Sequence, residues 1–427
     1  MKLKTLATAM ILATVPATAT FAAALDRSGQ SIAGFLQPGN YFEAGISVLD
    51  ADVSGRAFTG ENTGDMAGSY YFPSATLKLQ LNEQFSVGLL YDQPFGADAD
   101  YTDMSAAFNP TGNDGTSAEV ETQNLTLLVG FQPNQNWNFY AGPVYQEAKG
   151  SVSLRGAAYN ALGVAKYDAD MKKDGDIGWA AGLAYQIPEI ALKASLTYRS
   201  EIDHELNATE TLGGPGVSVR NGTVGIVAQG ILATLPPGTP LSAVLPTANG
   251  MVSAFTNGKT PVTTPQSVNL DFQSGIMADT VAFANIRWVD WDGFAIRPHQ
   301  FGQALDNLAA LPGQGHLKGG NLVEYNEDQW SVTAGVGRKF SDKWAANVAV
   351  GWDSGVDNPI STLGPVDGYW SLGVGAQYSP AANYFIAGGV KYFWLGDAQA
   401  LTVSTPNVGQ FKDNNAIGYG LKMGYRF

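Results

Sequence analysis

The feature that most constrains the fold of this 427-residue chain is a strict alternation of apolar residues with small or polar ones at its C-terminus. The apolar members are Tyr419, Leu421, Met423, Tyr425 and Phe427. A period of two predicts a β-strand with one apolar face. The pattern recurs over 75–81, 125–131, 190–198 and 370–378, and strands of about ten residues with this alternation are typical of outer-membrane proteins. Phe427 also resembles the terminal signal that the barrel-assembly machinery reads.

The connections between the predicted strands alternate between tight turns and long loops. Tight turns are predicted at 82–84, 133–136, 188–189, 278–280, 341–343 and 380–383, and long loops after Asp50, Pro94, Tyr145, Ile202, Trp291, Trp352 and Trp394. Six tight turns separate seven hairpins, which predicts 14 strands with both ends in the periplasm. Because unpaired backbone groups are costly in lipid, we expect an all-β fold, a closed transmembrane antiparallel β-barrel.

The N-terminus predicts a secretory signal peptide over residues 1–24. Lys2 and Lys4 precede the apolar run 6–15, and small residues follow, with cleavage expected after Ala22 or Ala24. The alternative is a membrane anchor, but the run is shorter than the roughly 20 residues that a span needs. The barrel itself is expected over 41–427.

Composition narrows the function classes. The net charge of −14 argues against a nucleic-acid partner. The chain has no cysteine, and its three histidines, His204, His299 and His316, lie in predicted loops. No nucleophile elbow, metal-ligand spacing or phosphate loop occurs, so we expect no enzyme activity, no metal and no cofactor.

Several cations occupy positions that the alternation turns toward the lumen. They are Lys78, Lys193, Arg199, Arg287, Lys391 and Lys422. A carboxylate that enters a low-dielectric lumen needs such a partner, so these residues are candidate ligand contacts. The alternative is that each pairs with an acidic residue of the lumen, such as Glu43, Asp92 or Glu201.

The third predicted strand is interrupted at Pro94, Phe95 and Gly96. Proline cannot donate to the strand ladder, and glycine permits unusual backbone angles. An interruption inside the wall would leave a gap through which an apolar ligand can leave sideways. The alternative is that Pro94 only ends the strand at the outer rim.

The fourth external loop, about 203–264, is long and unusually apolar. Exposed apolar groups usually mark an interaction surface, so we expect a groove between the third and fourth loops, built in part by short helices. The alternative is a loop core packed on itself. The groove candidates are Leu162, Ile226, Ile231, Leu235 and Leu245.

Over nearly all its mature length the chain resembles the FadL/TodX family of outer-membrane transporters of hydrophobic compounds. The resemblance is carried by six short segments in the family's order and spacing. They are 50–55 (DADVSG), 91–96 (YDQPFG), 196–201 (LTYRSE), 265–267 (PQS), 341–344 (SDKW) and 352–354 (WDS) leading to Pro359.

The resemblance implies a 14-stranded barrel whose lumen is closed by an N-terminal hatch. It implies capture by loops three and four, a deeper site where a cation meets the carboxylate, and lateral exit at a kinked third strand. Here only residues 25–40 precede the first strand, and the family's Asn-Pro-Ala motif is missing. We therefore expect a reduced hatch and a more open lumen.

The resulting hypothesis is passive uptake of long-chain fatty acids or similar hydrophobic molecules across a bacterial outer membrane. The expected partners are the ligand, outer-membrane lipid and lipopolysaccharide, and the assembly machinery, with the protein acting as a monomer. Alternatives are an aromatic-hydrocarbon channel, a nonspecific porin and, in another class, an outer-membrane hydrolase.

Overall fold

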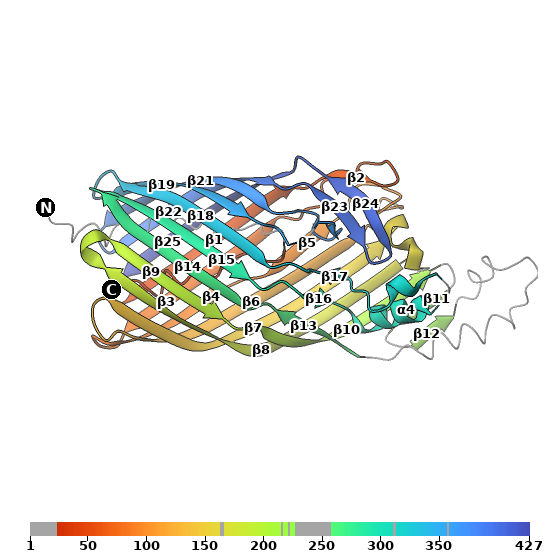
Figure 1. Cartoon of the computed structure of the whole chain (residues 1–427), viewed down its shortest axis with the longest axis horizontal. Helices are drawn as coiled ribbons and strands as arrows, with labels where there is room; N and C mark the ends of the chain where they lie inside the picture. The colour runs from red at the N-terminus through yellow and green to blue at the C-terminus, as the bar shows by residue number, and fades with distance from the viewer. Residues whose placement is uncertain are drawn as a thin grey trace, which may run out of the picture.

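The computed structural model describes residues 24–162, 166–214, 217–220, 223–226, 258–310, 313–356 and 358–427. Its main body is a long, closed barrel of antiparallel strands, with the short turns and Phe427 at one end and the long loops at the other (Figure 1). The predicted signal peptide over residues 1–24 lies, except for Ala24, outside the described residues and stays a prediction.

Fourteen membrane-crossing strands make up the wall, as the turn pattern predicted, and β25 pairs with β1 to close it. Three of them consist of two segments: β4 and β5, β9 and β10, and β13 and β14. The strands of the wall are β1 (Tyr41–Asp52), β3 (Tyr70–Gln80), β4 (Phe85–Asp92), β5 (Gly96–Asp100), β6 (Ser117–Phe131), β7 (Trp137–Arg155), β8 (Lys166–Ile187), β9 (Leu192–Arg199), β10 (Ile202–Gly214), β13 (Lys259–Thr264), β14 (Ser267–Met277), β15 (Thr280–Val289), β18 (Gln329–Lys339), β19 (Trp344–Asp353), β21 (Tyr369–Ala381), β22 (Tyr384–Leu395) and β25 (Asn415–Arg426).

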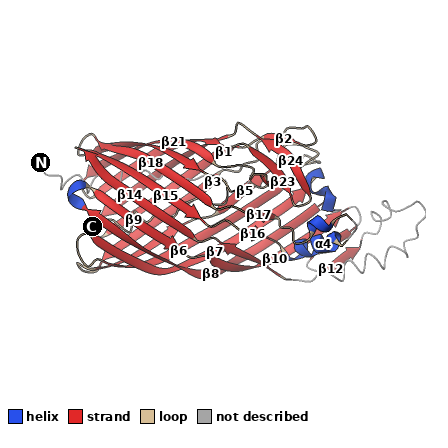
Figure 2. Ribbon diagram, in the orientation of Figure 1, coloured by secondary structure: helices blue, strands red, loops and turns tan. Residues whose placement is uncertain are grey.

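Smaller elements lie mainly among the external loops, as Figure 2 shows. A small sheet joins β2 (Gly55–Ala57), β24 (Thr405–Phe411), β23 (Ala398–Thr402) and β20 (Ile360–Ser361). The others are β11 (Val217–Arg220), β12 (Thr223–Ile226), β16 (Ala295–Ile296), β17 (Val323–Glu324), the helix α4 (His299–Ala309) and the 3-10 turns η2 (Ala157–Leu162), η3 (Pro188–Ile190, at the periplasmic end) and η4 (Gly315–Leu317). Within the described residues, no helix is both long and apolar enough to cross a bilayer.

The fourth external loop differs from its prediction at both ends. Residues 202–214 and 259–264 are strands that pair with each other, and residues 208–213 also pair with β8, so the wall extends beyond the point where the loop was expected to begin. Residues 217–220 and 223–226 form a further hairpin instead of helices. These residues form a strand because the long strand β8 has backbone groups that are free to pair, and pairing satisfies the backbone groups of both strands.

The tight periplasmic turns are formed by side chains that cap the backbone. Asn82 and Asn134 each accept two backbone N–H groups through Oδ1, and Ser341 accepts two through Oγ. Such short polar side chains mimic a backbone turn, which is why these residues mark hairpins in sequence.

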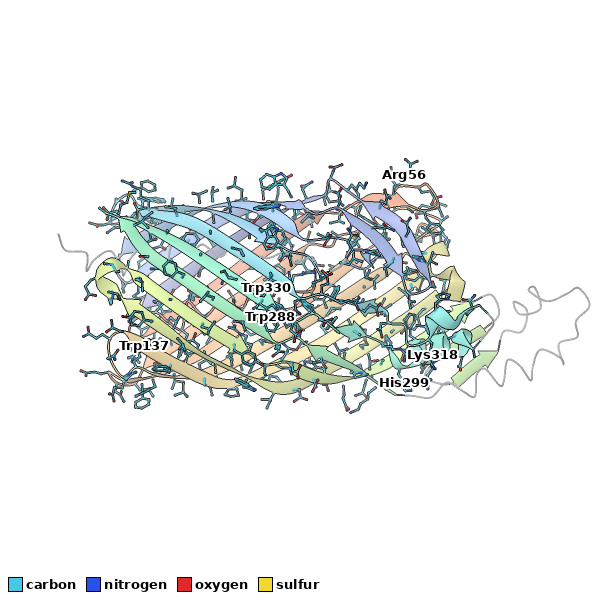
Figure 3. All side chains as sticks on the ribbon, viewed as in Figure 1. Arg56, Trp137, Trp288, His299, Lys318 and Trp330 are labelled. Carbon is cyan, nitrogen blue, oxygen red and sulfur yellow. The ribbon has the colours of Figure 1, made fainter. Side chains whose placement is uncertain are left out.

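The lipid-facing side of the wall carries the alternating apolar residues that the sequence predicted. Ile417, Tyr419, Leu421, Met423 and Tyr425 of β25 are all exposed. Aromatic side chains collect at two heights, as in the girdles of outer-membrane barrels. In Figure 3, Trp137 lies near the periplasmic end, whereas Trp288 and Trp330, which face each other across β15 and β18, lie about halfway along the molecule. The external half of the structure therefore stands above the membrane.

Inside the barrel, the external half is filled by one apolar cluster that includes Phe72, Phe95, Phe108, Trp291 and Phe411. Above the membrane, the hydroxyls of Tyr101 and Tyr159 both bond to Thr362, and burial raises the pKa of each tyrosine. These hydrogen bonds fasten the cluster across loops far apart in sequence.

The buried Glu210 of β10 fastens helix α4 to the wall. Its carboxylate accepts the N–H groups of Gln300 and Phe301 at 2.9 Å each, and the hydroxyl of Tyr167 at 2.9 Å. We expect Glu210→Gln to weaken this attachment by about 2–4 kcal/mol, because charge-assisted hydrogen bonds are lost and the amide NH2 that replaces one carboxylate oxygen faces a backbone N–H donor. Faster hydrogen exchange in residues 299–309 would show it, with the exposed Glu324→Gln of the same loop as control.

Candidate functional site

Residues 24–40, before the first strand, lie inside the lumen. Ile32, Phe35 and Leu36 are buried there, and the ring of Phe35 meets that of Tyr140 edge to face at 5.6 Å. Gly88 makes room for Phe35, because a Cβ at position 88 would lie 2.2 Å from that ring. We call residues 24–40 the N-terminal segment. It follows that the inner wall and this segment fit each other side chain by side chain.

Arg287, one of the predicted lumen cations, is bound to the N-terminal segment by a buried ion pair. Its guanidinium lies 2.7 Å from a carboxylate oxygen of Asp26, and the two side chains are only 1% and 2% exposed. The remaining donors reach Asn269 Oδ1 at 2.6 Å and Gln30 Oε1 at 3.0 Å. A charge so deeply buried is tolerated because it is paired and hydrogen-bonded.

Three more of the predicted cations donate to backbone carbonyls of the N-terminal segment. Lys78 reaches Gln37 O at 2.6 Å, Lys193 reaches Leu36 O at 2.7 Å, and Arg199 reaches Gln30 O. A ligand carboxylate could reach Lys78 or Arg199 only by displacing the segment, whereas Lys193 also lines a cavity. The expected pairing with an acidic residue is seen, among the described residues, for Arg287 with Asp26 at 2.7 Å and for Lys422 with Glu43 at 3.4 Å.

Lys391 behaves differently from the other five. Among the described residues its ammonium makes no hydrogen bond or ion pair, although the residue is only 4% exposed. It lies over the rings of Phe393 and Tyr369, at 4.8 and 5.6 Å, and lines a cavity between the N-terminal segment and the wall. Among the described residues it is therefore the one candidate cation that lines this cavity without a hydrogen-bond or ion-pair partner.

The interruption predicted in the third wall strand lies within the wall. β4 ends at Asp92 and β5 begins at Gly96, and both pair with β6. On the other side, β3 pairs with β4 only as far as Tyr91. Beyond that point, in the described part of the chain, β3 and β5 share no ladder, and the contacts across are the Tyr70 hydroxyl with the backbone of Asp98 and an isolated bridge between Ala67 and Ala99. The hydrogen-bonded wall is thus open on one side of Pro94–Gly96.

The N-terminal segment covers this interruption from inside. The N–H of Gly96 donates to Leu25 O at 2.8 Å, the N–H of Arg27 donates to Pro94 O at 2.6 Å, and Asp26 pairs with Phe95 as an isolated antiparallel bridge. Ser28 also donates to Asp92 at 2.6 Å. The segment therefore supplies the backbone partners that the kinked strand lacks.

Three small apolar-lined cavities meet at one side chain of the N-terminal segment, Leu25. Each has a volume of about 30 Å³, and Leu25 lines all three. The first lies at the interruption, next to Tyr70 and Ala97. The second lies under Phe95 and Trp291, whose rings meet at 5.5 Å. The side chain of Leu25 thus separates three small apolar cavities beside the break in the wall.

The predicted loop groove is only partly within the described structure. Leu162 ends η2 and Ile226 ends β12, but their side chains lie outside the description, as do Ile231, Leu235 and Leu245 altogether. Sequence reasoning placed Leu25, Asp26 and Gln30 in the reduced hatch over 25–40 but missed them as site residues. An acidic residue just after the predicted signal peptide, in a chain with many predicted lumen cations, was the available signal for Asp26.

Comparisons with known proteins agree on the nature of the chain. A family model described as outer membrane protein transport protein (OMPP1/FadL/TodX) matches residues 15–427. The long-chain fatty acid transport protein of Salmonella typhi is 22% identical over 384 residues, covering 82% of this chain and 77% of its own length. The protein of the same name from Escherichia coli (strain K12) is 25% identical over 195 residues, or 38% of this chain and 42% of its own.

Solved structures share the fold. A Pseudomonas aeruginosa FadL homologue aligns with a TM-score of 0.65 at 15% identity, over 99% of this chain and 98% of its own. The Pseudomonas putida toluene transporter TodX aligns with a TM-score of 0.60 at 13% identity, over 92% and 91%. Since the family model spans almost the whole sequence, the chain belongs to the OMPP1/FadL/TodX family of outer-membrane transport proteins.

Proposed function

We propose that this protein carries long-chain fatty acids or similar hydrophobic molecules passively across the outer membrane. The external half of the barrel is filled with apolar side chains, which suits an uncharged or weakly polar cargo. The relatives named as long-chain fatty acid transport proteins support the same class of cargo. A single chain supplies the whole closed wall, which supports a monomeric transporter.

The observation that carries the proposal is the unpaired stretch between β3 and β5. Unpaired backbone groups in lipid are unfavourable, so a stretch of wall that keeps them is expected to serve a function. Cargo taken up between loops three and four moves past Leu25 and leaves through this break into the bilayer, once the N-terminal segment withdraws its hydrogen bonds from Pro94 and Gly96.

A disulfide across the break tests the lateral exit. Ala67 and Ala99 are antiparallel bridge partners, and such pairs have Cα atoms about 4.5–5.5 Å apart, within the range that a disulfide spans. The chain has no cysteine of its own, so Ala67→Cys with Ala99→Cys forms only the intended bond. We expect oxidation to reduce uptake of a labelled fatty acid by cells at least about tenfold and reduction to restore it, because the bond fixes both sides of the exit.

A matched control uses Ala44→Cys with Ala75→Cys, which are partners in the unbroken β1–β3 ladder. Oxidation of this pair should leave uptake unchanged. Full uptake by the oxidised Ala67–Ala99 protein, with the bond verified by mass spectrometry, would rule out exit at this position.

One observation favours a neutral cargo such as an aromatic hydrocarbon. Arg287, Arg199, Lys78 and Lys193 are all bonded to the N-terminal segment, so no carboxylate partner among them faces the external lumen. Competition decides between the two cargoes: if toluene blocks fatty-acid uptake at lower concentrations than a second fatty acid does, the neutral cargo is the better ligand.

A further inference from the structure

The lumen holds a further cavity, separate from the three around Leu25. It has a volume of about 170 Å³ and lies between residues 29–36 of the N-terminal segment and the wall from β9 to β22. The break in the third strand is contacted by residues 25–28 of the same segment, so the cavity lies away from the lateral exit. A ligand here needs its own explanation.

The cavity follows one row of strand partners around the wall. The row runs through Lys391, Gly373, Ala349, Gly335, Phe283, Gln273 and Lys193. Glycine and alanine in the middle of the row leave the space, and a lysine stands at each end. Lys193 is the second residue of β9, directly above a periplasmic turn, so the cavity extends toward the periplasmic end.

The cations of this cavity differ in whether a carboxylate contacts them directly. Arg287 is paired with Asp26, and the lining acid Asp271 accepts hydrogen bonds from Asn285 at 2.8 Å and Ser195 at 3.4 Å, which leave its own negative charge in the cavity. Lys193 donates to the backbone carbonyl of Leu36, which satisfies one N–H group of the ammonium but provides no counter-charge. Lys391 has neither a hydrogen bond nor an ion pair among the described residues. The buried acid Asp353 acts on Lys391 through its charge but forms no ion pair with it, and its own hydrogen bonds come from Gln329 and Gly355. Because a buried ammonium without a counter-ion in contact is costly, an anion on Lys391 would be stabilised.

A second polar group beside Lys391 also lacks a partner. The hydroxyl of Ser371 is buried and, among the described residues, makes no hydrogen bond. A Cβ built on Gly351 would lie 2.5 Å from this hydroxyl, 3.3 Å from the hydroxyl of Thr333 and 3.6 Å from the ammonium of Lys391, so the three groups lie over the same glycine. Thr333 lines the cavity together with Lys391, and one cationic donor and one hydroxyl at a single point suit the two oxygens of a carboxylate.

The other residues of the lining favour a small ligand that has both apolar and polar surface. Ile32, Leu36 and Phe283 are apolar, whereas Thr333, Asn285 and Asn347 are polar. An engineered apolar cavity of about 150 Å³ holds one benzene ring, and a long acyl chain needs far more.

We propose that this cavity is a second ligand site, which binds a small carboxylate with a ring-sized body and holds its anionic group on Lys391. The site opens toward the periplasmic end and does not depend on the proposed lateral route.

Benzoate is the probe for calorimetric titration of the purified full-length mature protein. Lys391→Met removes the charge and keeps the stem, and we expect it to weaken benzoate binding at least about tenfold, as loss of a charge-assisted hydrogen bond does. Lys391→Arg keeps the charge and should stay within a few-fold of the native affinity. Lys422→Met is the matched control, because this neighbouring lumen lysine is already paired with Glu43, and it should bind as the native protein does.

A labelling experiment locates the ligand. Since the chain has no cysteine, Thr333→Cys places one thiol in the cavity lining. An anionic thiosulfonate reagent should modify it faster than a cationic one, benzoate should protect it, and Lys391→Met should remove both effects.

Absence of benzoate binding to the native protein, native affinity in Lys391→Met, or an equal loss in Lys422→Met would each overturn the proposal. Uptake of hydrophobic cargo is measured separately. If benzoate does not bind but uptake is intact, the proposed lateral route is still supported. If benzoate binds as expected but the lateral route fails its test, the second ligand site is still supported.

Discussion

Asp26→Ala is expected to release the N-terminal segment from the lumen while the barrel stays folded. The change leaves Arg287 buried without its counter-ion, and breaking a buried pair in this way costs about 3–5 kcal/mol. That loss falls on the segment, because the wall strands keep their own ladders. Hydrogen exchange of the amides of Arg27 and Gly96, which bond across the break, should accelerate by roughly two to three orders of magnitude.

A double variant tests whether the loss comes from the unpaired charge of Arg287 or from the missing side-chain contact. Asp26→Leu combined with Arg287→Met replaces the ion pair with apolar groups, and such replacements are often neutral. The double variant should therefore recover most of the protection that Asp26→Ala loses. Unchanged exchange in Asp26→Ala, with β25 protected equally in all variants, would mean that the pair does not hold the segment.

Leu25→Trp is expected to block uptake of hydrophobic cargo. The larger side chain fills the three cavities that meet at Leu25 and leaves no space there for cargo to pass. Because the surrounding interior is close-packed and cannot widen to compensate, we expect the uptake rate to fall roughly tenfold or more. Leu25→Ala joins the cavities and should favour bulkier cargo. Uptake of a series of hydrophobic molecules of increasing size, measured in cells with equal amounts of barrel, gives both results.

The control for this series is Leu25→Met, which preserves volume and flexibility and should behave like the native protein. If the tryptophan variant transports as fast as the native chain, cargo does not pass Leu25. The route must then run elsewhere in the external lumen.

The wall was predictable because its physics is local. Alternation over 415–427 and short polar turns such as Asn134 depend on neighbours in sequence, and they predicted the strand count and the exposed face of β25. The interruption at Pro94–Gly96 was predictable for the same reason, since proline and glycine act on their own backbone.

The interior was less predictable because its contacts join distant residues. Asp26 and Arg287 lie 261 positions apart, and Lys78 and Lys193 bond to backbone carbonyls, which leave no mark in the sequence. The cations were correctly placed on the lumen face, but their partners were not. The extension of β10 into the expected loop was missed because its pairing depends on the length of β8.

The N-terminal segment runs straight into β1 at Tyr41, and this junction has a kinetic consequence. A segment joined to its own wall by a short connection rebinds as an intramolecular partner, at an effective concentration in the millimolar range. Each excursion away from the break is therefore followed by recapture without any external signal. A free peptide that copies residues 24–40 would have to reach similar millimolar levels to compete for the same place.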